Sequence, residues 1–150
     1  NLLYTGFISQ SGDLSIYKIE NNSIVETYAD KLDGLFYTNL IAYNGFFYAL
    51  SSDGQIFRIN IATGDTTSIQ LDNVSTKESR IYIQTVDNRT FICVGIDGNM
   101  IYAFTENLEL MPGFPVAGTG IPAFADVNGD GYLDCFALTI DNKINAWNLR

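Results

Sequence analysis

The chain has 150 residues, of which 47% are hydrophobic, so it can bury a core and is not a disordered polymer. Its net charge of −9 would repel a phosphate backbone, which argues against nucleic acid as a partner. The absence of histidine excludes Ser-His-Asp and Cys-His catalysis and removes the commonest zinc ligand. No apolar run reaches the roughly 18 residues that a membrane helix needs. No signal peptide is visible, but the chain opens in a strand-like stretch, so this start does not argue against secretion.

Four repeated hairpins follow in chain order, each with an apolar strand, a tight turn and a second alternating strand. They cover residues 4–14, 47–56, 91–100 and 136–144. The expected turn residues, separated by 42, 44 and 44 positions, are Gly12, Gly54, Gly98 and Asn142. All four tolerate the positive φ of a two-residue hairpin turn. In the third copy the following strand slips by one position, which indicates a bulge or a three-residue turn.

The second repeat shows the complete unit. Strands are predicted over residues 38–43, 46–51, 55–61 and 66–71. Turn residues separate them at Asn44-Gly45, Asp53-Gly54 and Thr63-Gly64-Asp65. A period of about 44 residues with about four short antiparallel strands is typical of a β-propeller blade. Helix is nearly absent from this prediction: residues 77–80 could form one turn but fit a loop better.

The sequence therefore predicts an all-β fold of about three and a half propeller blades. Their approximate bounds are 1–31, 32–75, 76–117 and 118–150, with three, four, four and three strands. Because both ends fall inside a blade, we expect a partial propeller: a fragment of a longer ring, or a piece that closes by associating with another chain. A small closed ring of four blades is the alternative.

One loop has the composition of a calcium site. Between residues 126 and 134, oxygen-bearing side chains stand at the first, third, fifth and ninth positions, as Asp126, Asn128, Asp130 and Asp134. Calcium takes six to eight oxygen ligands, and the Tyr132 carbonyl can supply another. Three carboxylates repel one another unless a cation neutralises them. An Asp/Asn/Gly-rich turn without metal is the alternative.

This loop is not an EF-hand. Its first six positions match the EF-hand pattern, but position twelve is Ala137 instead of a bidentate glutamate, and strand residues follow. Of the corresponding segments in the other blades, residues 42–45 have no carboxylate, and residues 86–90 are shorter and have Arg89 where a ligand might stand. We therefore predict one Ca2+ site, with ligands Asp126, Asn128, Asp130, Tyr132 (carbonyl) and Asp134.

Three segments carry a family resemblance: residues 112–116 (Pro-Gly-Phe-Pro-Val), 122–131 (Pro-Ala-Phe-Ala-Asp-Val-Asn-Gly-Asp-Gly) and 142–148 (Asn-Lys-Ile-Asn-Ala-Trp-Asn). The stretch 110–149 resembles the FG-GAP/VCBS repeat of integrin α-subunit-like propellers. That resemblance implies calcium held between two strands of a blade by the same five residues. Residues 1–109 are more similar to quinoprotein-like or YVTN-like blades, which lack the metal loop. The family consists mostly of extracellular or periplasmic adhesion and binding modules, and some members are parts of carbohydrate-active enzymes.

The two cysteines, Cys93 and Cys135, have no CxxC spacing. Aligning Asp97 with Asp141 places both on the same face of equivalent strands, so they should point the same way and not at each other. We expect free, buried thiols.

The aromatic clusters, the glycosylation sequons and the carboxylates outside the loop do not indicate a further functional site. Aromatic clusters such as Phe36-Tyr37 and residues 46–48 could stack on sugars, but we expect them to fill the space between blades. The three glycosylation sequons begin at Asn21, Asn73 and Asn88, and they are discounted because they can arise by chance. No carboxylate pair stands out as a general acid and base.

The sequence thus favours a calcium-stabilised, non-catalytic binding or scaffold module, extracellular, on the cell surface or in the periplasm. Its protein or carbohydrate ligand is unspecified. The alternative is a fragment of a propeller enzyme that acts on polysaccharide or uses a quinone cofactor, with catalytic residues outside this segment. A third reading is an assembly role, in which open blade edges pair with a partner or a second copy.

Overall fold

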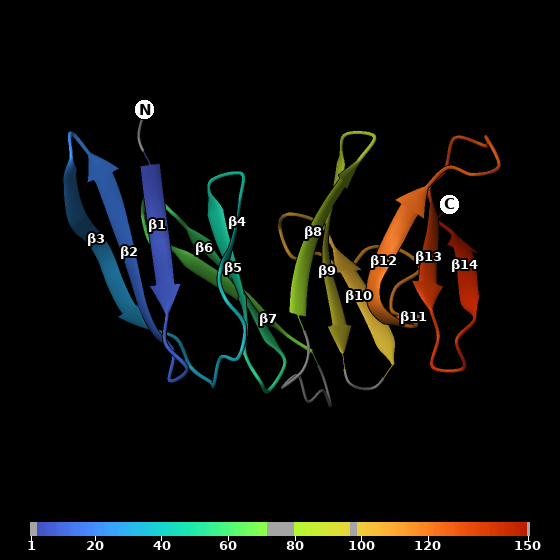
Figure 1. Cartoon of the computed structure of the whole chain (residues 1–150), viewed down its shortest axis with the longest axis horizontal. Helices are drawn as coiled ribbons and strands as arrows, with labels where there is room; N and C mark the ends of the chain where they lie inside the picture. Colours follow the sequence, from blue (N-terminus) through green and yellow to red (C-terminus); the bar gives the residue numbers. More distant parts are fainter. Residues whose placement is uncertain (1–2, 72–79, 97–98, 150) are drawn as a thin grey trace. The chain divides into compact units, whose positions relative to one another are not determined.

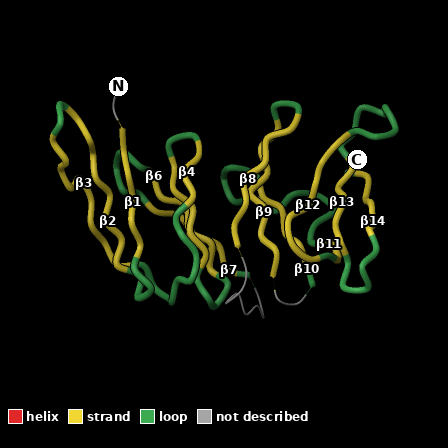
Figure 2. The backbone as a smooth tube through the Cα atoms, viewed as in Figure 1, coloured by secondary structure: helices red, strands yellow, loops and turns green. Residues whose placement is uncertain are grey.

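The computed structural model describes residues 3–71, 80–96 and 99–149, which form four antiparallel sheets (Figure 1). Figure 2 shows only strands and loops in this part of the chain. Accordingly, no helix among the described residues is long and apolar enough to cross a lipid bilayer. The prediction of an all-β chain with blade-like antiparallel sheets is confirmed.

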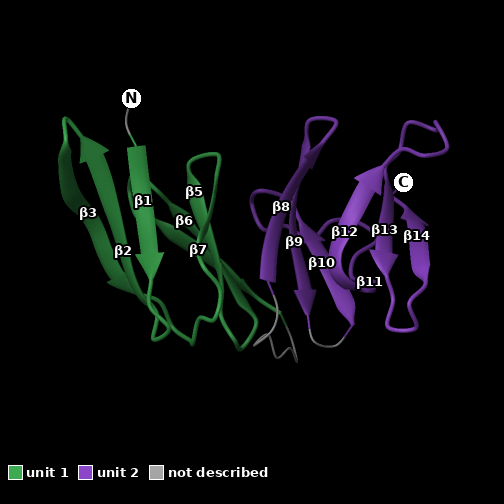
Figure 3. Ribbon diagram, viewed as in Figure 1, with its two compact units in different colours: residues 1–77 green, residues 78–150 purple. Residues whose placement is uncertain are grey.

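The chain divides into two compact units, residues 1–77 and 78–150 (Figure 3). Unit 1 holds a sheet of three strands in the order β1-β2-β3 and a sheet of four in the order β4-β5-β6-β7. The strands of unit 1 are β1 (Leu3–Ile8), β2 (Asp13–Glu20), β3 (Ser23–Lys31), β4 (Ile41–Tyr43), β5 (Phe46–Leu50), β6 (Gln55–Asn60) and β7 (Thr66–Gln70).

Unit 2 holds a sheet in the order β11-β10-β9-β8 and a sheet in the order β12-β13-β14. The strands of unit 2 are β8 (Arg80–Val86), β9 (Arg89–Ile96), β10 (Met100–Phe104), β11 (Val116–Ala117), β12 (Thr119–Ala125), β13 (Asp134–Leu138) and β14 (Ile144–Asn148). Arg80 therefore begins a strand and not a helical turn, and residues 77–79 lie outside the described residues.

Of two predicted details of the second repeat, one is wrong and one is confirmed. The strand expected over residues 38–43 begins only at Ile41, and Leu40 before it packs against the core of unit 1. The Asn44-Gly45 turn is confirmed, since both residues have positive φ, of 45° and 81°. Such a pair closes a two-residue hairpin whose twist matches that of its strands.

The repeated turns are three-residue loops, not the two-residue turns that we predicted. In the first, second and fourth copies, the N–H of Ser9, Ser51 and Thr139 donates to the carbonyl four residues on, at 2.9, 2.9 and 2.8 Å. The third loop residue has positive φ in each case: 91° at Gly12, 89° at Gly54 and 59° at Asn142. The third loop residue therefore takes the left-handed conformation that lets a three-residue hairpin close.

The third hairpin is offset by one residue from the predicted alignment. Ile96 pairs with Met100, and the left-handed residue is Asn99, with φ of 57°. The N–H of Asn99 donates to the carbonyl of Ile96 at 3.2 Å. Asn99, and not Gly98, is thus equivalent to Gly54; Gly98 itself lies outside the described residues. Because strand side chains alternate, a shift of one residue moves every side chain of β9 to the opposite face.

Each unit has its own core between its two sheets. In unit 1, Leu14 and Ile16 of the first sheet pack with Ala49 and Ile59 of the second. In unit 2, Cys93 and Ile101 of the first sheet pack with Cys135 and Ala137 of the second. Sheets that bury one face against each other in this way are the layers from which all-β folds are built.

Candidate metal centre

The candidate loop joins β12 to β13, and its two ends are held by the sheet. Ala125, the last residue of β12, pairs directly with Asp134, the first residue of β13. Between them the chain turns at Gly129 and Gly131, whose φ values of 74° and 84° are unfavourable for residues with a side chain. The loop is therefore anchored at both ends, and its acidic residues are confined to a short path.

Asp126 organises the start of the loop. Its Oδ1 accepts the backbone N–H of Gly129 at 2.7 Å and that of Asp130 at 3.2 Å, and its Oδ2 accepts the N–H of Gly131 at 2.9 Å. A carboxylate that receives several backbone donors makes strong, charge-assisted hydrogen bonds. Asp126 thus folds the backbone of the loop around its own side chain.

Asn128 and Asp130 continue this pattern. The side-chain oxygen of Asn128 accepts the N–H of Asp130 at 2.9 Å, and Oδ1 of Asp130 accepts the N–H of Tyr132 at 2.9 Å. The other oxygen of Asp130 accepts the side-chain amides of Asn128 at 3.3 Å and Asn148 at 3.2 Å. All three oxygen-bearing side chains of the first five positions are thus drawn into one turn.

Asp134 closes the loop from the sheet and is buried, with 6% of its surface exposed. Its Oδ1 accepts the Asn148 amide at 2.9 Å, and its Oδ2 accepts the N–H of Val127 at 3.3 Å. A buried carboxylate needs such donors, because an unpaired charge away from water is costly. Asp134 therefore depends on both the loop and strand β14.

Asn148 is the residue of this site that sequence reasoning missed as a partner. It lies on β14 directly opposite Asp134, and its one amide group bridges Asp130 and Asp134. The strand register contained the signal: counting outward from the β13–β14 turn pairs Leu138 with Ile144 and, four residues further, Asp134 with Asn148.

The donor chemistry of the loop suits a hard cation. It offers three carboxylates, one amide oxygen and backbone carbonyls, with no nitrogen or sulfur ligand, and this is the set that calcium prefers. Among the residues that the structure describes, however, no three acidic, cysteine or histidine side chains gather into a group that could enclose a metal. Instead, N–H donors offset the negative charge. To hold a cation, Asp130 and Asp134 would exchange the Asn148 amide for it.

The corresponding segments of the second and third sheets have no such loop. Residues 44–45 and 87–88 are two-residue hairpin turns, with positive φ at each residue. Two of the sequons also lie at hairpin tips, at Asn21 and at Asn88, whereas the one at Asn73 falls outside the described residues.

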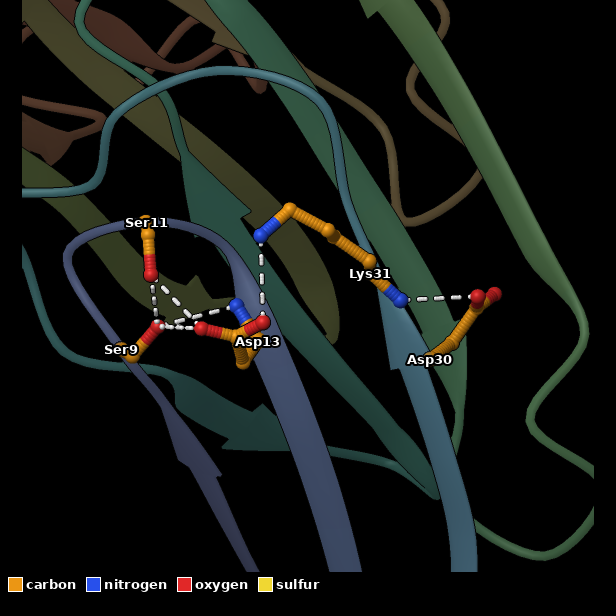
Figure 4. A network of polar contacts seen from close by, with 5 residues as sticks. All are labelled: Ser9, Ser11, Asp13, Asp30 and Lys31. Carbon is orange, nitrogen blue, oxygen red and sulfur yellow. Dashed lines mark hydrogen bonds and ion pairs between the residues drawn. The ribbon is translucent and has the colours of Figure 1, made fainter.

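A second polar network closes the β1–β2 turn (Figure 4). Oδ2 of Asp13 accepts the hydroxyls of Ser11 at 2.6 Å and Ser9 at 2.8 Å, and its Oδ1 faces the Lys31 ammonium at 3.1 Å. The two hydroxyls, followed by Lys31, hold the pKa of Asp13 well below its usual range. The network is exposed and belongs to the turn, and its single carboxylate is already paired with two hydroxyls and an ammonium group.

The cysteines are free and buried, as predicted. The prediction that the two side chains point the same way, and not at each other, is wrong, because Cys93 and Cys135 belong to one core cluster. The offset of the third hairpin explains this: it turns Cys93 to the face that meets β13. Burial raises the pKa of Cys93 to about 12, with a further contribution from Cys135, and burial raises the pKa of Cys135 to about 11.

The fold and the comparison with solved structures define the class of the protein: its four antiparallel sheets are blades of a partial β-propeller. Among the solved structures that the chain resembles is that of BamB from Moraxella catarrhalis, with a TM-score of 0.60 and 14% sequence identity. The likeness covers 99% of this chain and 43% of that one, so the chain spans less than half of the BamB structure. No family model matches the sequence, and no curated protein matches it. The likeness is therefore one of fold.

Proposed function

We propose that this chain is a non-catalytic β-propeller binding or scaffold module in which calcium stabilises the β12–β13 loop. The observation that carries the proposal is the anchored, oxygen-rich loop itself: Asp126 folds its backbone, and the Asn148 amide bridges Asp130 and Asp134. In its bound form, Asp126, Asn128, Asp130, the Tyr132 carbonyl and Asp134 would hold the ion. Calcium would supply charge neutralisation and rigidity to the loop, and it would take no part in a reaction.

The proposed location is outside the cytoplasm, on a cell surface or in the periplasm. The resemblance of residues 110–149 to the FG-GAP/VCBS repeat supports this location and also the ligand set. Calcium sites of extracellular modules have dissociation constants of about 10⁻⁴ to 10⁻³ M, because calcium is abundant there. An affinity in this range is expected, since the loop must give up existing hydrogen bonds to Asn148 when it binds.

Calcium titration of the chelator-treated chain, followed by calorimetry and by thermal unfolding, tests the proposal. One ion should bind per chain and should raise the melting temperature. Asp130→Asn keeps the size of the side chain but removes one charge, and it should weaken binding at least tenfold. Asp65→Asn, in the β6–β7 turn of the other unit, is the matched control and should bind like the wild type. If wild type and Asp130→Asn respond equally to calcium, the loop is a metal-free turn.

A further inference from the structure

The first observation concerns one face of each of the four sheets. Next to each repeated turn stands a cross-strand pair: Ile8 with Leu14, Leu50 with Ile56, Gly95 with Ile101, and Leu138 with Ile144. The second members, Leu14, Ile56 and Ile101, are 1%, 0% and 0% exposed, whereas Ile144 is 74% exposed. We call the face that carries these four residues the leading face. It is buried in three sheets and bare in the β12–β14 sheet.

The opposite face shows the reverse pattern. Its equivalent positions, one residue before the cross-strand pair, are Phe7, Ala49, Val94 and Ala137. Ala49, Val94 and Ala137 are 0%, 0% and 3% exposed, but Phe7 is 61% exposed. We call this face the trailing face. It is buried in three sheets and bare in the β1–β3 sheet.

Inside each unit, a leading face packs on a trailing face. In unit 1, Leu14 shares a core cluster with Ala49, and in unit 2, Ile101 shares one with Ala137. In unit 2 the two faces leave no room around Gly118. A Cβ placed on this glycine would stand 2.9 Å from Cδ1 of Ile101 and 2.7 Å from Cβ of Ala137. The chain therefore contains the same face-to-face arrangement twice.

Both bare faces expose large apolar side chains, as a sheet covered on both sides requires. On the leading face of β12–β14, two cross-strand rows have no charged residue: Ala123, Phe136 and Ala146, and then Thr119, Leu138 and Ile144. The row next to the loop is Ala125, Asp134 and Asn148, in which Asp134 is buried. On the trailing face of β1–β3, one row is Leu3, Ile19 and Ile24, with Leu3 60% and Ile24 68% exposed. The next row is Thr5, Tyr17 and Glu26, with the one carboxylate on the outer strand β3. Beside it, the Phe7 ring contacts Tyr17 edge-on at 5.9 Å.

We propose that the bare leading face of one copy of this chain packs on the bare trailing face of a second copy. The two bare faces are unlike: one is a leading face and the other a trailing face. Within each unit, a leading face already packs on a trailing face in this way. A pairing of two leading faces or of two trailing faces has no counterpart within either unit. Contact between unlike faces is heterologous, so it closes into a ring or extends into a chain of copies. One copy matches 43% of the length of the BamB propeller structure, and two copies would together match about 86% of it.

The experiment measures the mass of the 150-residue chain by light scattering and sedimentation over a range of concentrations. The wild type should form dimers or larger assemblies. Ile144→Asp places a charge on the leading face, and Phe7→Asp places one on the trailing face. Each should weaken association by roughly 30-fold or more, as hot-spot substitutions do. Both positions are exposed, so the variants should keep the wild-type circular dichroism and melting behaviour.

Mixing the two variants separates unlike from like contact. A mixture of Ile144→Asp and Phe7→Asp retains one intact leading face and one intact trailing face, so it should form one-to-one dimers at concentrations at which each variant alone is monomeric. Ile140→Asp, in the β13–β14 turn at 70% exposure, is the matched control and should assemble like the wild type. A monomeric wild type would overturn the proposal, as would association of either single variant at wild-type strength. These outcomes do not depend on calcium.

Discussion

The side-chain amide of Asn148 donates to Oδ1 of the buried Asp134 at 2.9 Å and thereby joins β14 to the first residue of β13. The same amide reaches Asp130 at 3.2 Å, so one neutral side chain lies between two carboxylates of the loop. This relationship ties the acidic loop to β14, and it is the contact with which calcium would compete in the proposed site.

Asn148→Ala should destabilise the metal-free chain by about 1–3 kcal/mol, because it leaves the buried Asp134 without its amide donor. Denaturant unfolding in the presence of a chelator measures the change. Asn145→Ala, an exposed position on the same strand, is the control and should change stability by less than about 0.5 kcal/mol. Equal stability of the two variants would mean that the Asn148 bridge contributes nothing.

Asn148→Asp should make stability strongly dependent on calcium. A third carboxylate beside Asp130 and Asp134 adds like-charge repulsion that a divalent cation relieves. The melting temperature of this variant should fall below that of the wild type in chelator and rise more than that of the wild type when calcium is added. A smaller rise than in the wild type would show that the Asn148 side chain lies away from the ion.

Gly64→Ala should destabilise unit 1 by more than the cost of a left-handed alanine alone. A Cβ on Gly64 would stand 2.1 Å from Cδ2 of Tyr28, and the residue has φ of 79°. Gly45→Ala is the matched control, because Gly45 has φ of 81° and nothing within 4 Å of its Cβ. Gly45→Ala should cost about 1 kcal/mol and Gly64→Ala a further 1–3 kcal/mol in chemical unfolding. Equal costs would mean that the Tyr28 ring moves aside freely.

The buried thiols should be inert at neutral pH and should make stability fall in alkali. Their pKa values, about 12 for Cys93 and about 11 for Cys135, lie above the ordinary value of 9.0. Between pH 9 and about 11 the unfolded chain therefore loses thiol protons that the folded chain keeps, so the free energy of unfolding decreases as pH rises. Native protein at pH 8 should not react with a disulfide reagent, whereas denaturant should expose two thiols.

Cys93→Ala provides the control for this slope. It removes the thiol with the larger upward shift, so the alkaline decrease in stability should become shallower than in the wild type. An unchanged slope would assign the effect to tyrosines and not to Cys93.

The local parts of the fold were predictable from the sequence because turn chemistry is local. Gly12, Gly54 and Asn142 take the positive φ that their residue types permit, and the apolar alternation around them defines strands. The hydroxyls of Ser9 and Ser51, which accept the N–H four residues on at 2.9 and 3.0 Å, were present in the sequence but were not recognised as part of the turns. The calcium assignment of the β12–β13 loop stays a prediction.

The register of the third hairpin was not predictable in the same way. Asp97-Gly98 looks like the other turns, yet the left-handed position falls on Asn99. One tertiary contact accompanies this register. Gly95 takes the position that Ile8, Leu50 and Leu138 have in the other repeats. It lies under β12, and a Cβ on it would stand 2.9 Å from the Gly120 carbonyl oxygen. The one-residue offset then brings Cys93 to the face that meets Cys135.

By itself, the sequence determined the all-β character, the repeat and the acidic composition of the 126–134 loop, since these follow from backbone preferences and residue types that act over a few positions. Only the tertiary structure decided which face each strand presents, which side chain bridges Asp130 and Asp134, and which two sheet faces are left bare. Those outcomes depend on packing between residues far apart in the chain, such as Asn148 with Asp130, and a shift of one residue in register would reverse them.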